Sequence, residues 1–234
     1  MFYNLPVVLI SNPETATPTP VDNGDISALF HLRLDAQKGF EKIETFQKAR
    51  AQSALILIKL ALARGLLTPA HFRRVIDFGA GRGGTTFALV NIAKIVEGEV
   101  EAVEEDPERG LKIVNAGILP IEFVHIGEGI ASLESLATNE SNEVDLVTSF
   151  MLQPSQNGQL FRALATVSSC LLTDMGLLLV NSDLKTLNGV ETICRESGAQ
   201  LYNLGQKMER DNNDNDIFTG TFILPKAACQ AIVS

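Results

Sequence analysis

The chain has 234 residues, of which 45% are hydrophobic and 20% are charged, and its formal net charge is −9. A chain of this length can bury the core of one domain, whereas a second full domain would be cramped. The acidic balance argues against nucleic acid as a partner, because broad phosphate-binding surfaces are basic.

Residues 1–72 are expected to form a linker and a helical extension. The start of the chain, MFYNLPVVLIS, has no positive charge before its apolar stretch, so it predicts no secretory signal. Residues 11–24 are rich in Pro, Thr, Asn and Asp, which predicts a loop. Residues 35–64 carry apolar side chains at helical spacing and are followed by Gly65, which predicts one long helix or a pair of helices. The longest apolar run in the chain is far too short to span a bilayer, so we expect no membrane partner.

From residue 73 onward, strand and helix patterns alternate, which predicts a parallel sheet with helices on both faces. The candidate strands are 73–78, 99–104, 121–126, 144–149 and 176–181. The candidate helices are 84–97, 107–116, 128–138 and 156–172. Asp106 and Pro107 suit a helix start, because Asp can cap it and Pro fits its first turn. Gly98 and Gly117 stand where helix ends need a left-handed residue.

The end of the chain departs from this alternation. Residues 199–205 and 217–224 both have strand patterns. The connection between them is polar and too short for the crossover that a parallel return requires. We therefore expect the last two strands to form an antiparallel hairpin.

Cysteines and histidines give no metal-binding pattern. No C-x-x-C pair occurs, and free thiols fit a reducing, cytoplasmic compartment; the cysteines are Cys170, Cys194 and Cys229. No H-x-x-x-H spacing occurs, so we expect no metal site. His125 lies in an apolar strand pattern and is expected to be a core histidine with a hydrogen-bond partner. His31 and His71 are expected on the surface.

The most distinctive motif is the stretch Asp77-Phe78-Gly79-Ala80-Gly81-Arg82-Gly83-Gly84, between a predicted strand and a predicted helix. Glycines let the backbone turn tightly and approach a ligand with no Cβ in the way. The free N–H groups at the start of the helix open onto the same turn. A strand, a glycine turn and a helix together predict a nucleotide-type binding site.

Two phosphate-binding interpretations of this turn meet difficulties. A P-loop needs a lysine where Thr85 stands. A dinucleotide fingerprint is satisfied by Gly79, Gly81 and Gly84, and Glu104 could bind a ribose hydroxyl. The Asp77 carboxylate, however, would repel a pyrophosphate. An NAD-type oxidoreductase remains an alternative.

The same residues resemble the first motif of the class I S-adenosylmethionine (SAM)-dependent methyltransferases, in which an acid is followed by glycines at alternate positions. Here these are Asp77, Gly79, Gly81 and Gly83. Residues 102–107 resemble the second motif, residues 123–128 a third segment and residues 142–150 the fourth motif. The resemblance covers roughly residues 73–225. It implies a doubly wound, mostly parallel α/β sheet of seven strands with an antiparallel last strand, helices on both faces, and SAM as the cofactor.

The resemblance also implies which residues bind the cofactor. The candidates are Asp77, Phe78, Gly79, Ala80, Gly81, Gly83, Glu104, Glu105, Glu128 and Ser149. Glu104 is the expected ribose ligand, and Glu105 is the alternative. Strand alternation points the two side chains to opposite sides, so they cannot both line the site. Phe150 and Gln153 are substrate-side candidates at the carboxyl ends of the strands. No residue stands out as a catalytic base.

The sequence therefore predicts a SAM-dependent methyltransferase core over residues 73–234, acting on a small molecule or a protein side chain. The fourth motif has Thr148-Ser149-Phe150 where many amino-methyltransferases carry Asn/Asp-Pro-Pro-Tyr/Phe, so amine chemistry loses support. The helix within residues 35–64 is expected to pack beside the carboxyl ends of the strands and to line the acceptor site. A SAM-binding or partner-binding member of the fold that has lost catalysis is the other alternative.

Overall fold

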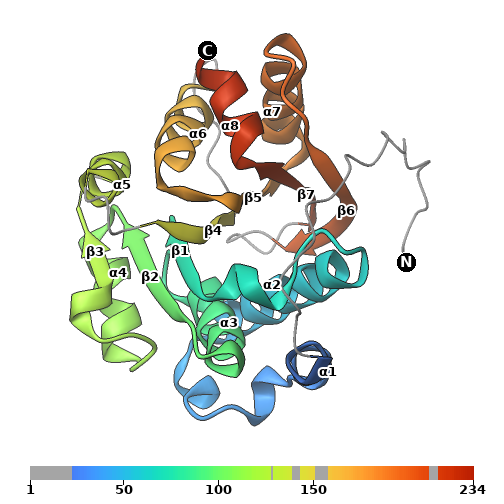
Figure 1. Ribbon diagram of the computed structural model, residues 1–234. Coiled ribbons are helices and arrows are strands. Elements are labelled where there is room, and N and C mark those ends of the chain that lie inside the picture. The colour runs from blue at the N-terminus through green and yellow to red at the C-terminus, as the bar shows by residue number, and fades with distance from the viewer. Residues whose placement is uncertain (1–22, 128, 139–142, 151–157, 211–215) are drawn as a thin grey trace.

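The computed structural model describes residues 23–127, 129–138, 143–150, 158–210 and 216–234 (Figure 1). Their strands form one sheet in the order β3-β2-β1-β4-β5-β7-β6. The strands are β1 (Arg74–Phe78), β2 (Glu99–Glu104), β3 (Val124–Ile126), β4 (Val144–Phe150), β5 (Leu172–Asp183), β6 (Tyr202–Arg210) and β7 (Asp216–Pro225). In the described residues, no helix combines the length and apolarity needed to cross a membrane.

The pairing of the strands confirms the predicted sheet. β1 lies inside the sheet and pairs in parallel with β2 and β4, and the pairs β2–β3 and β4–β5 are also parallel. β7 runs antiparallel to both of its neighbours, β5 and β6. The terminal hairpin expected from the short polar connection is therefore present, and β7 is the antiparallel last strand.

Helices cover both faces of the sheet, as the alternating pattern predicts (Figure 1). One face carries α1 (Asn23–His31), α2 (Thr45–Ala63), α3 (Gly84–Ala93) and α4 (Pro107–Asn115). The other carries α5 (Gly129–Ala137), α6 (Gln159–Leu171), α7 (Leu184–Glu196) and α8 (Lys226–Val233). Each face has its own cluster of buried apolar side chains, so the fold is doubly wound.

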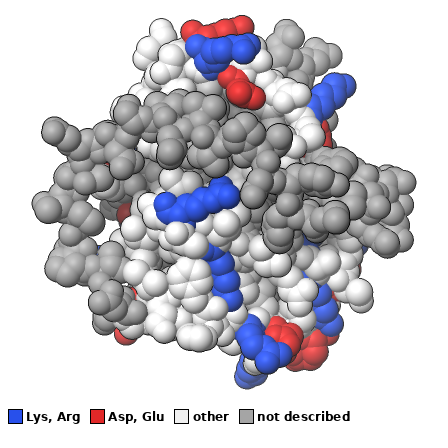
Figure 2. All heavy atoms as spheres, turned by 90° about the vertical axis from the view of Figure 1, so that its right-hand side faces the viewer, with Lys and Arg blue, Asp and Glu red and all other residues white. Residues whose placement is uncertain are grey.

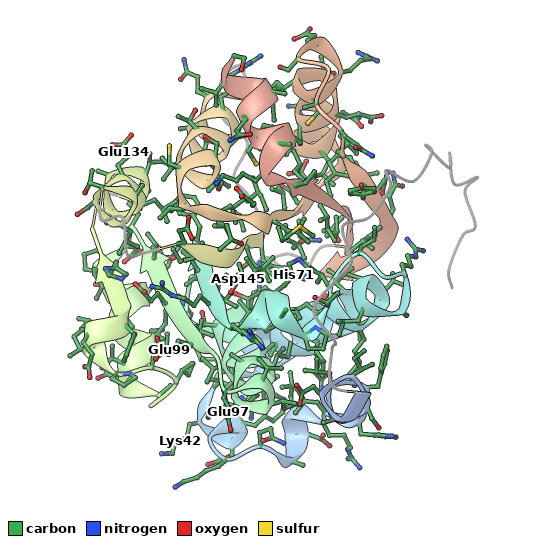
Figure 3. The ribbon with its side chains drawn as sticks, viewed as in Figure 1. Lys42, His71, Glu97, Glu99, Glu134 and Asp145 are labelled. Carbon is green, nitrogen blue, oxygen red and sulfur yellow. The ribbon has the colours of Figure 1, made fainter. Side chains whose placement is uncertain are left out.

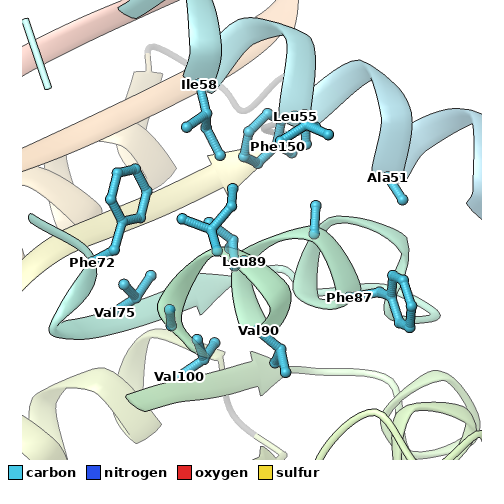
Figure 4. Close-up of a cluster of buried hydrophobic side chains, with 14 of the residues drawn as sticks. Ala51, Leu55, Ile58, Phe72, Val75, Phe87, Leu89, Val90, Val100 and Phe150 are labelled. Carbon is cyan, nitrogen blue, oxygen red and sulfur yellow. The ribbon is translucent and has the colours of Figure 1, made fainter. Parts of the chain in front are cut away.

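Helix α2 is part of the core and packs on α3 (Figure 4). Ala51, Ala54 and Ile58 recur at helical spacing on its buried side, and none of the three is exposed. The small side chains of Ala51 and Ala54 let the two helices approach, while Ile58 and Leu89 fill the space between α2, α3 and the sheet (Figure 4). Burial of each large side chain contributes about 1.5–3 kcal/mol.

The predicted helix over residues 35–64 begins later than expected, because α2 starts at Thr45. Two short 3-10 turns, Leu34–Ala36 and Phe40–Lys42, precede it. Gly39 separates them with a φ of 94°, a conformation that interrupts any continuous helix. Most of the predicted loop over residues 11–24 lies outside the described residues, and its last two positions begin α1.

Several other boundaries differ from the predicted ones. β3 is shorter, because the residues after Pro120 form a 3-10 turn, Ile121–Phe123, before the strand begins. β5 begins at Leu172, and β6 continues to Arg210 through polar residues that gave no strand pattern. α7 and α8 were not predicted, although Asp183 caps α7 by accepting a hydrogen bond from the Thr186 N–H.

Three helix-end residues were predicted, of which two are confirmed and one is wrong. Asp106 accepts hydrogen bonds from two N–H groups in the first turn of α4, and Gly117 has a φ of 69°. The left-handed residue after α3 is Glu97, with a φ of 54°, and not Gly98. Gly98 is required for space instead, since a Cβ there would lie 2.1 Å from the Phe72 carbonyl oxygen.

Candidate functional site

The turn between β1 and α3 is built by glycines in the left-handed region. Gly79, Gly81 and Gly83 have φ values of 70°, 59° and 88°, which other residues adopt only with strain. A Cβ on Gly79 or Gly81 would meet nothing within 4 Å, whereas one on Gly83 would lie 2.6 Å from Ile118 Cδ1. The first half of the turn therefore has open space beside it, and the second half is packed against the core.

Asp77 is fully buried beneath this turn. Its Oδ2 accepts hydrogen bonds from Thr85 Oγ1 at 2.9 Å and Thr86 Oγ1 at 2.7 Å. Its Oδ1 accepts one from Thr148 Oγ1 at 2.9 Å. Burial raises the pKa of Asp77 to about 6, the hydrogen bonds oppose this rise, and the Glu104 charge adds to it. The carboxylate links β1 to α3 and β4 through these hydrogen bonds. None of the Asp77 surface is exposed. Direct contact of Asp77 with a cofactor stays a prediction.

Glu104 ends β2 and reaches the glycine turn from the neighbouring strand. Its Oε2 accepts a hydrogen bond from the Gly81 N–H at 2.5 Å, and its Oε1 accepts one from the Asp106 N–H at 3.0 Å. The side chain is nearly buried, with 5% of the residue exposed. A carboxylate has about four lone-pair positions. Two N–H donors therefore leave Glu104 able to accept further bonds from hydroxyl groups.

The alternation at the end of β2 is as expected. Glu104 turns toward the glycine turn, whereas Glu105 is exposed and its Cβ faces Gly129 at the start of α5. Phe78 also faces Gly129 and packs in the core of the opposite sheet face. Ala80 is buried within the turn. Of the predicted residues on β2, the structure brings only Glu104 to the turn.

The residues predicted at the end of β4 are buried. Ser149 is almost inaccessible, and Phe150 packs in the core beneath α2, beside Leu55 and Ile58 (Figure 4). Their roles toward cofactor and acceptor stay predictions. Glu128 and Gln153 lie outside the described residues.

Two residues that no sequence motif pointed to contact the glycine turn, Gln47 of α2 and Glu44, the N-cap of α2. Gln47 is 8% exposed, and its Oε1 accepts a hydrogen bond from the Gly84 N–H at 3.2 Å. Glu44, at the start of α2, forms ion pairs with Arg82 at 2.8 Å and with Lys112 at 2.7 Å. These pairs lower the pKa of Glu44. A glutamine on the buried side of an apolar helix was the one available signal in the sequence.

A second group of buried polar side chains lies on β5 and β7. Asn181 stands opposite Phe150 of β4, and its amide donates to the Gly220 carbonyl at 2.9 Å and to Thr221 Oγ1 at 3.0 Å. Thr219 Oγ1 is buried and has no hydrogen-bond partner in the described part of the structure. Together with Thr148 and Ser149 of β4, these residues form a buried polar strip across the sheet, from β4 to β7.

His71 and His125 are held by structural contacts, whereas His31 is exposed, as predicted. His125 Nε2 lies 2.6 Å from Glu101 Oε2, so it has the partner expected of it, although it is only half buried. His71 is also half buried and not on the surface as predicted. The Thr68 N–H donates to its Nδ1, so Nε2 carries the proton and donates to the Met175 carbonyl at 3.2 Å. Burial lowers the pKa of His71, although the nearby Asp145 acts in the opposite direction (Figure 3).

On the one face that Figure 2 shows, the charge of the described residues is mixed. In Figure 2 the Lys and Arg side chains stand singly or beside Asp and Glu, separated by uncharged surface. Among the side chains that the structure describes, no group of His, Cys, Asp and Glu could hold a metal ion.

No family model matches this chain, and no curated protein matches its sequence. Solved structures do match. One is a putative O-methyltransferase from Klebsiella pneumoniae, with a TM-score of 0.52 and 18% identity over 87% of this chain and 96% of that one. Another is the O-methyltransferase TomG from Streptomyces achromogenes in complex with SAM, with a TM-score of 0.52 and 15% identity over 86% and 95% of the two chains. The cofactor-bound Rv0187 from MTB has a TM-score of 0.51 and 18% identity over 90% and 99%.

These neighbours and the strand order together define the fold. The chain has the class I SAM-dependent methyltransferase fold, as the resemblance of its motifs implies. At these identities the likeness concerns the fold, and the chemistry has to be argued from the residues at the glycine turn.

Proposed function

We propose that this protein binds SAM at the turn after β1 and transfers its methyl group to a small molecule or a protein side chain. The observation that carries the proposal is the Glu104 carboxylate, fixed on the Gly81 N–H beside the open part of the turn. A carboxylate with lone pairs to spare suits the two hydroxyls of a ribose. The rest of the turn suits a ligand without phosphates, because both Glu104 and Asp77 would repel them.

Each of these residues has a different role in binding. Glu104 accepts hydrogen bonds from the ribose hydroxyls. Gly79 and Gly81 let the backbone approach the ligand closely, since no Cβ stands in the way. Asp77 holds the turn in place through the threonines at the start of α3 and on β4. When bound, SAM supplies a methyl group on a sulfonium, and holding the acceptor in line with it provides much of the acceleration.

The acceptor is proposed to lie over the carboxyl ends of β4 and β5, where open α/β sheets bind ligands. A nucleic acid acceptor is disfavoured by the net charge of −9 and by the mixed surface charge in Figure 2. The buried polar strip from β4 to β7 offers neutral hydrogen-bonding groups at this end of the sheet.

The proposal is tested by thermal shift and calorimetry with SAM, its demethylated product S-adenosylhomocysteine, NAD and ATP. A ligand at 100 times its Kd should stabilise the fold by about 2.7 kcal/mol, which is a shift of a few degrees. Glu104→Gln should weaken SAM binding by about 10-fold or more, because it removes charge-assisted bonds. Glu105→Gln is the matched control and should bind normally. Stabilisation by NAD and none by SAM would favour the oxidoreductase instead.

A transfer assay then separates an active enzyme from a binding protein. Methyl-labelled SAM is incubated with the protein and with separate pools of small molecules and of proteins. Label in either pool that disappears with Glu104→Gln supports catalysis. SAM binding with no transfer to any pool would favour the alternative of a member of the fold that has lost catalysis.

A further inference from the structure

Two separate segments of the chain hold the Glu104 carboxylate. The Gly81 N–H, from the glycine turn, binds Oε2. The Asp106 N–H, from the turn between β2 and α4, binds Oε1. Because each carboxylate oxygen is tied to a different segment, the orientation of Glu104 depends on how these two segments are placed relative to each other.

Helix α2 bridges these two segments. Glu44 Oε2 pairs with Arg82, the residue that follows Gly81 in the glycine turn. Glu44 Oε1 pairs with Lys112 on α4, the helix that Asp106 caps. One carboxylate on α2 therefore links the two segments whose N–H groups hold Glu104.

Gln47 adds a buried contact one turn further along α2. Its Oε1 accepts the Gly84 N–H, a free donor at the start of α3. A Cβ on Gly84 would lie 2.6 Å from the Gln47 carbonyl oxygen and 2.7 Å from Oε1, so only glycine permits this approach. The end of the glycine turn is thereby fixed against α2.

We propose that Glu44 and Gln47 are positioning residues for the ribose-binding carboxylate, so that cofactor recognition depends on helix α2. The inference rests on the proposed function, because SAM is the ligand whose recognition it concerns. It gives α2 a different role from the expected one, which was to line the acceptor site. Neither residue touches the ligand, and both act through the placement of Glu104.

The test compares binding of S-adenosylhomocysteine with that of an analogue lacking the ribose 2′-hydroxyl. The wild-type protein should bind S-adenosylhomocysteine more tightly than the analogue, because Glu104 accepts a hydrogen bond from the 2′-hydroxyl. Gln47→Leu should lower the affinity for S-adenosylhomocysteine by about 10-fold, because the Gly84 N–H loses its acceptor and the glycine turn that orients Glu104 is no longer fixed against α2. Glu44→Gln should lower it by about 3-fold, and the effect should fade at high salt because both ion pairs are half exposed. In both variants the ratio of the affinity for S-adenosylhomocysteine to the affinity for the analogue should be smaller than in the wild type.

The controls separate positioning from general loss of structure. Gln47→Glu retains an oxygen that can accept a hydrogen bond from the Gly84 N–H. This variant should therefore keep much of the affinity that Gln47→Leu loses. Gln52→Leu makes the same change at an exposed position on α2 and should bind as the wild type does. The melting temperature of each ligand-free variant shows that it is folded.

The outcomes distinguish this inference from the proposed function. A wild-type protein that binds neither ligand would overturn both. A wild-type protein that binds S-adenosylhomocysteine, with unchanged affinities in Glu44→Gln and Gln47→Leu, would overturn the inference alone. Equal losses for the two ligands would also overturn it, because a merely structural effect does not select for the 2′-hydroxyl.

Discussion

The buried carboxylate of Asp77 should make the stability of the protein depend on pH. Its pKa is about 6 in the folded state and about 3.8 in an exposed carboxyl. Because the folded-state pKa is the higher one, the folded state holds its proton longer as the pH rises. The contribution of Asp77 to stability is therefore fully present below about pH 3.8 and is lost as the pH rises through about 6. A difference of about two pKa units corresponds to about 3 kcal/mol.

The substitution Asp77→Asn isolates this effect, because an amide does not titrate. The free energy of unfolding is measured by urea denaturation of both proteins between pH 4 and pH 8. The wild type should lose about 2 kcal/mol relative to Asp77→Asn between pH 4 and pH 6, and the difference should level off above about pH 7. Any fixed offset from the altered hydrogen bonds cancels in this comparison.

A second variant tests the hydrogen bonds that oppose the shift. Thr148→Val removes one hydrogen bond to the charged form of Asp77, so it should raise the pKa of Asp77 further. Its destabilisation should be about 1.5–3 kcal/mol at pH 7 and smaller at pH 4. A difference between wild type and Asp77→Asn that stays flat from pH 4 to pH 8 would refute the reasoning.

Three further expectations concern the frame around the site. Gly98→Ala should destabilise by about 3 kcal/mol in urea denaturation, because its Cβ would meet the Phe72 carbonyl oxygen. The control Gly189→Ala, on an open position of α7, should be neutral or slightly stabilising, and equal losses in the two variants would contradict this explanation. Burial lowers the pKa of His71, so its contribution to stability should be lost as the pH falls through about 6.5, and an NMR titration should give a pKa below that value. Leu89→Ala should cost about 2–5 kcal/mol by opening a cavity between α2 and α3; a loss below 1 kcal/mol would mean that the two helices repack.

Much of the fold could be predicted because its signals are local. The alternation of strands and helices, the cap at Asp106 and the glycines at 79, 81 and 83 depend on periodicity and backbone sterics within a few residues. The antiparallel β7 followed from the length and polarity of one connection. Helices α7 and α8 were not predicted, although Asp183 is a local capping signal for the start of α7.

The site was predictable only in part. The sequence determined that a glycine turn follows β1 and that Glu104 ends the neighbouring strand, because both follow from motif spacing and strand alternation. Tertiary structure decided where the polar atoms find their partners. Asp77 is satisfied by a threonine 71 positions away, and the start of α3 by a glutamine 37 positions before it. The Arg82 and Lys112 side chains meet a glutamate 38 and 68 positions earlier in the chain. Local patterns fix the path of the backbone, but the partner of a buried polar group is set by whichever segment packs against it.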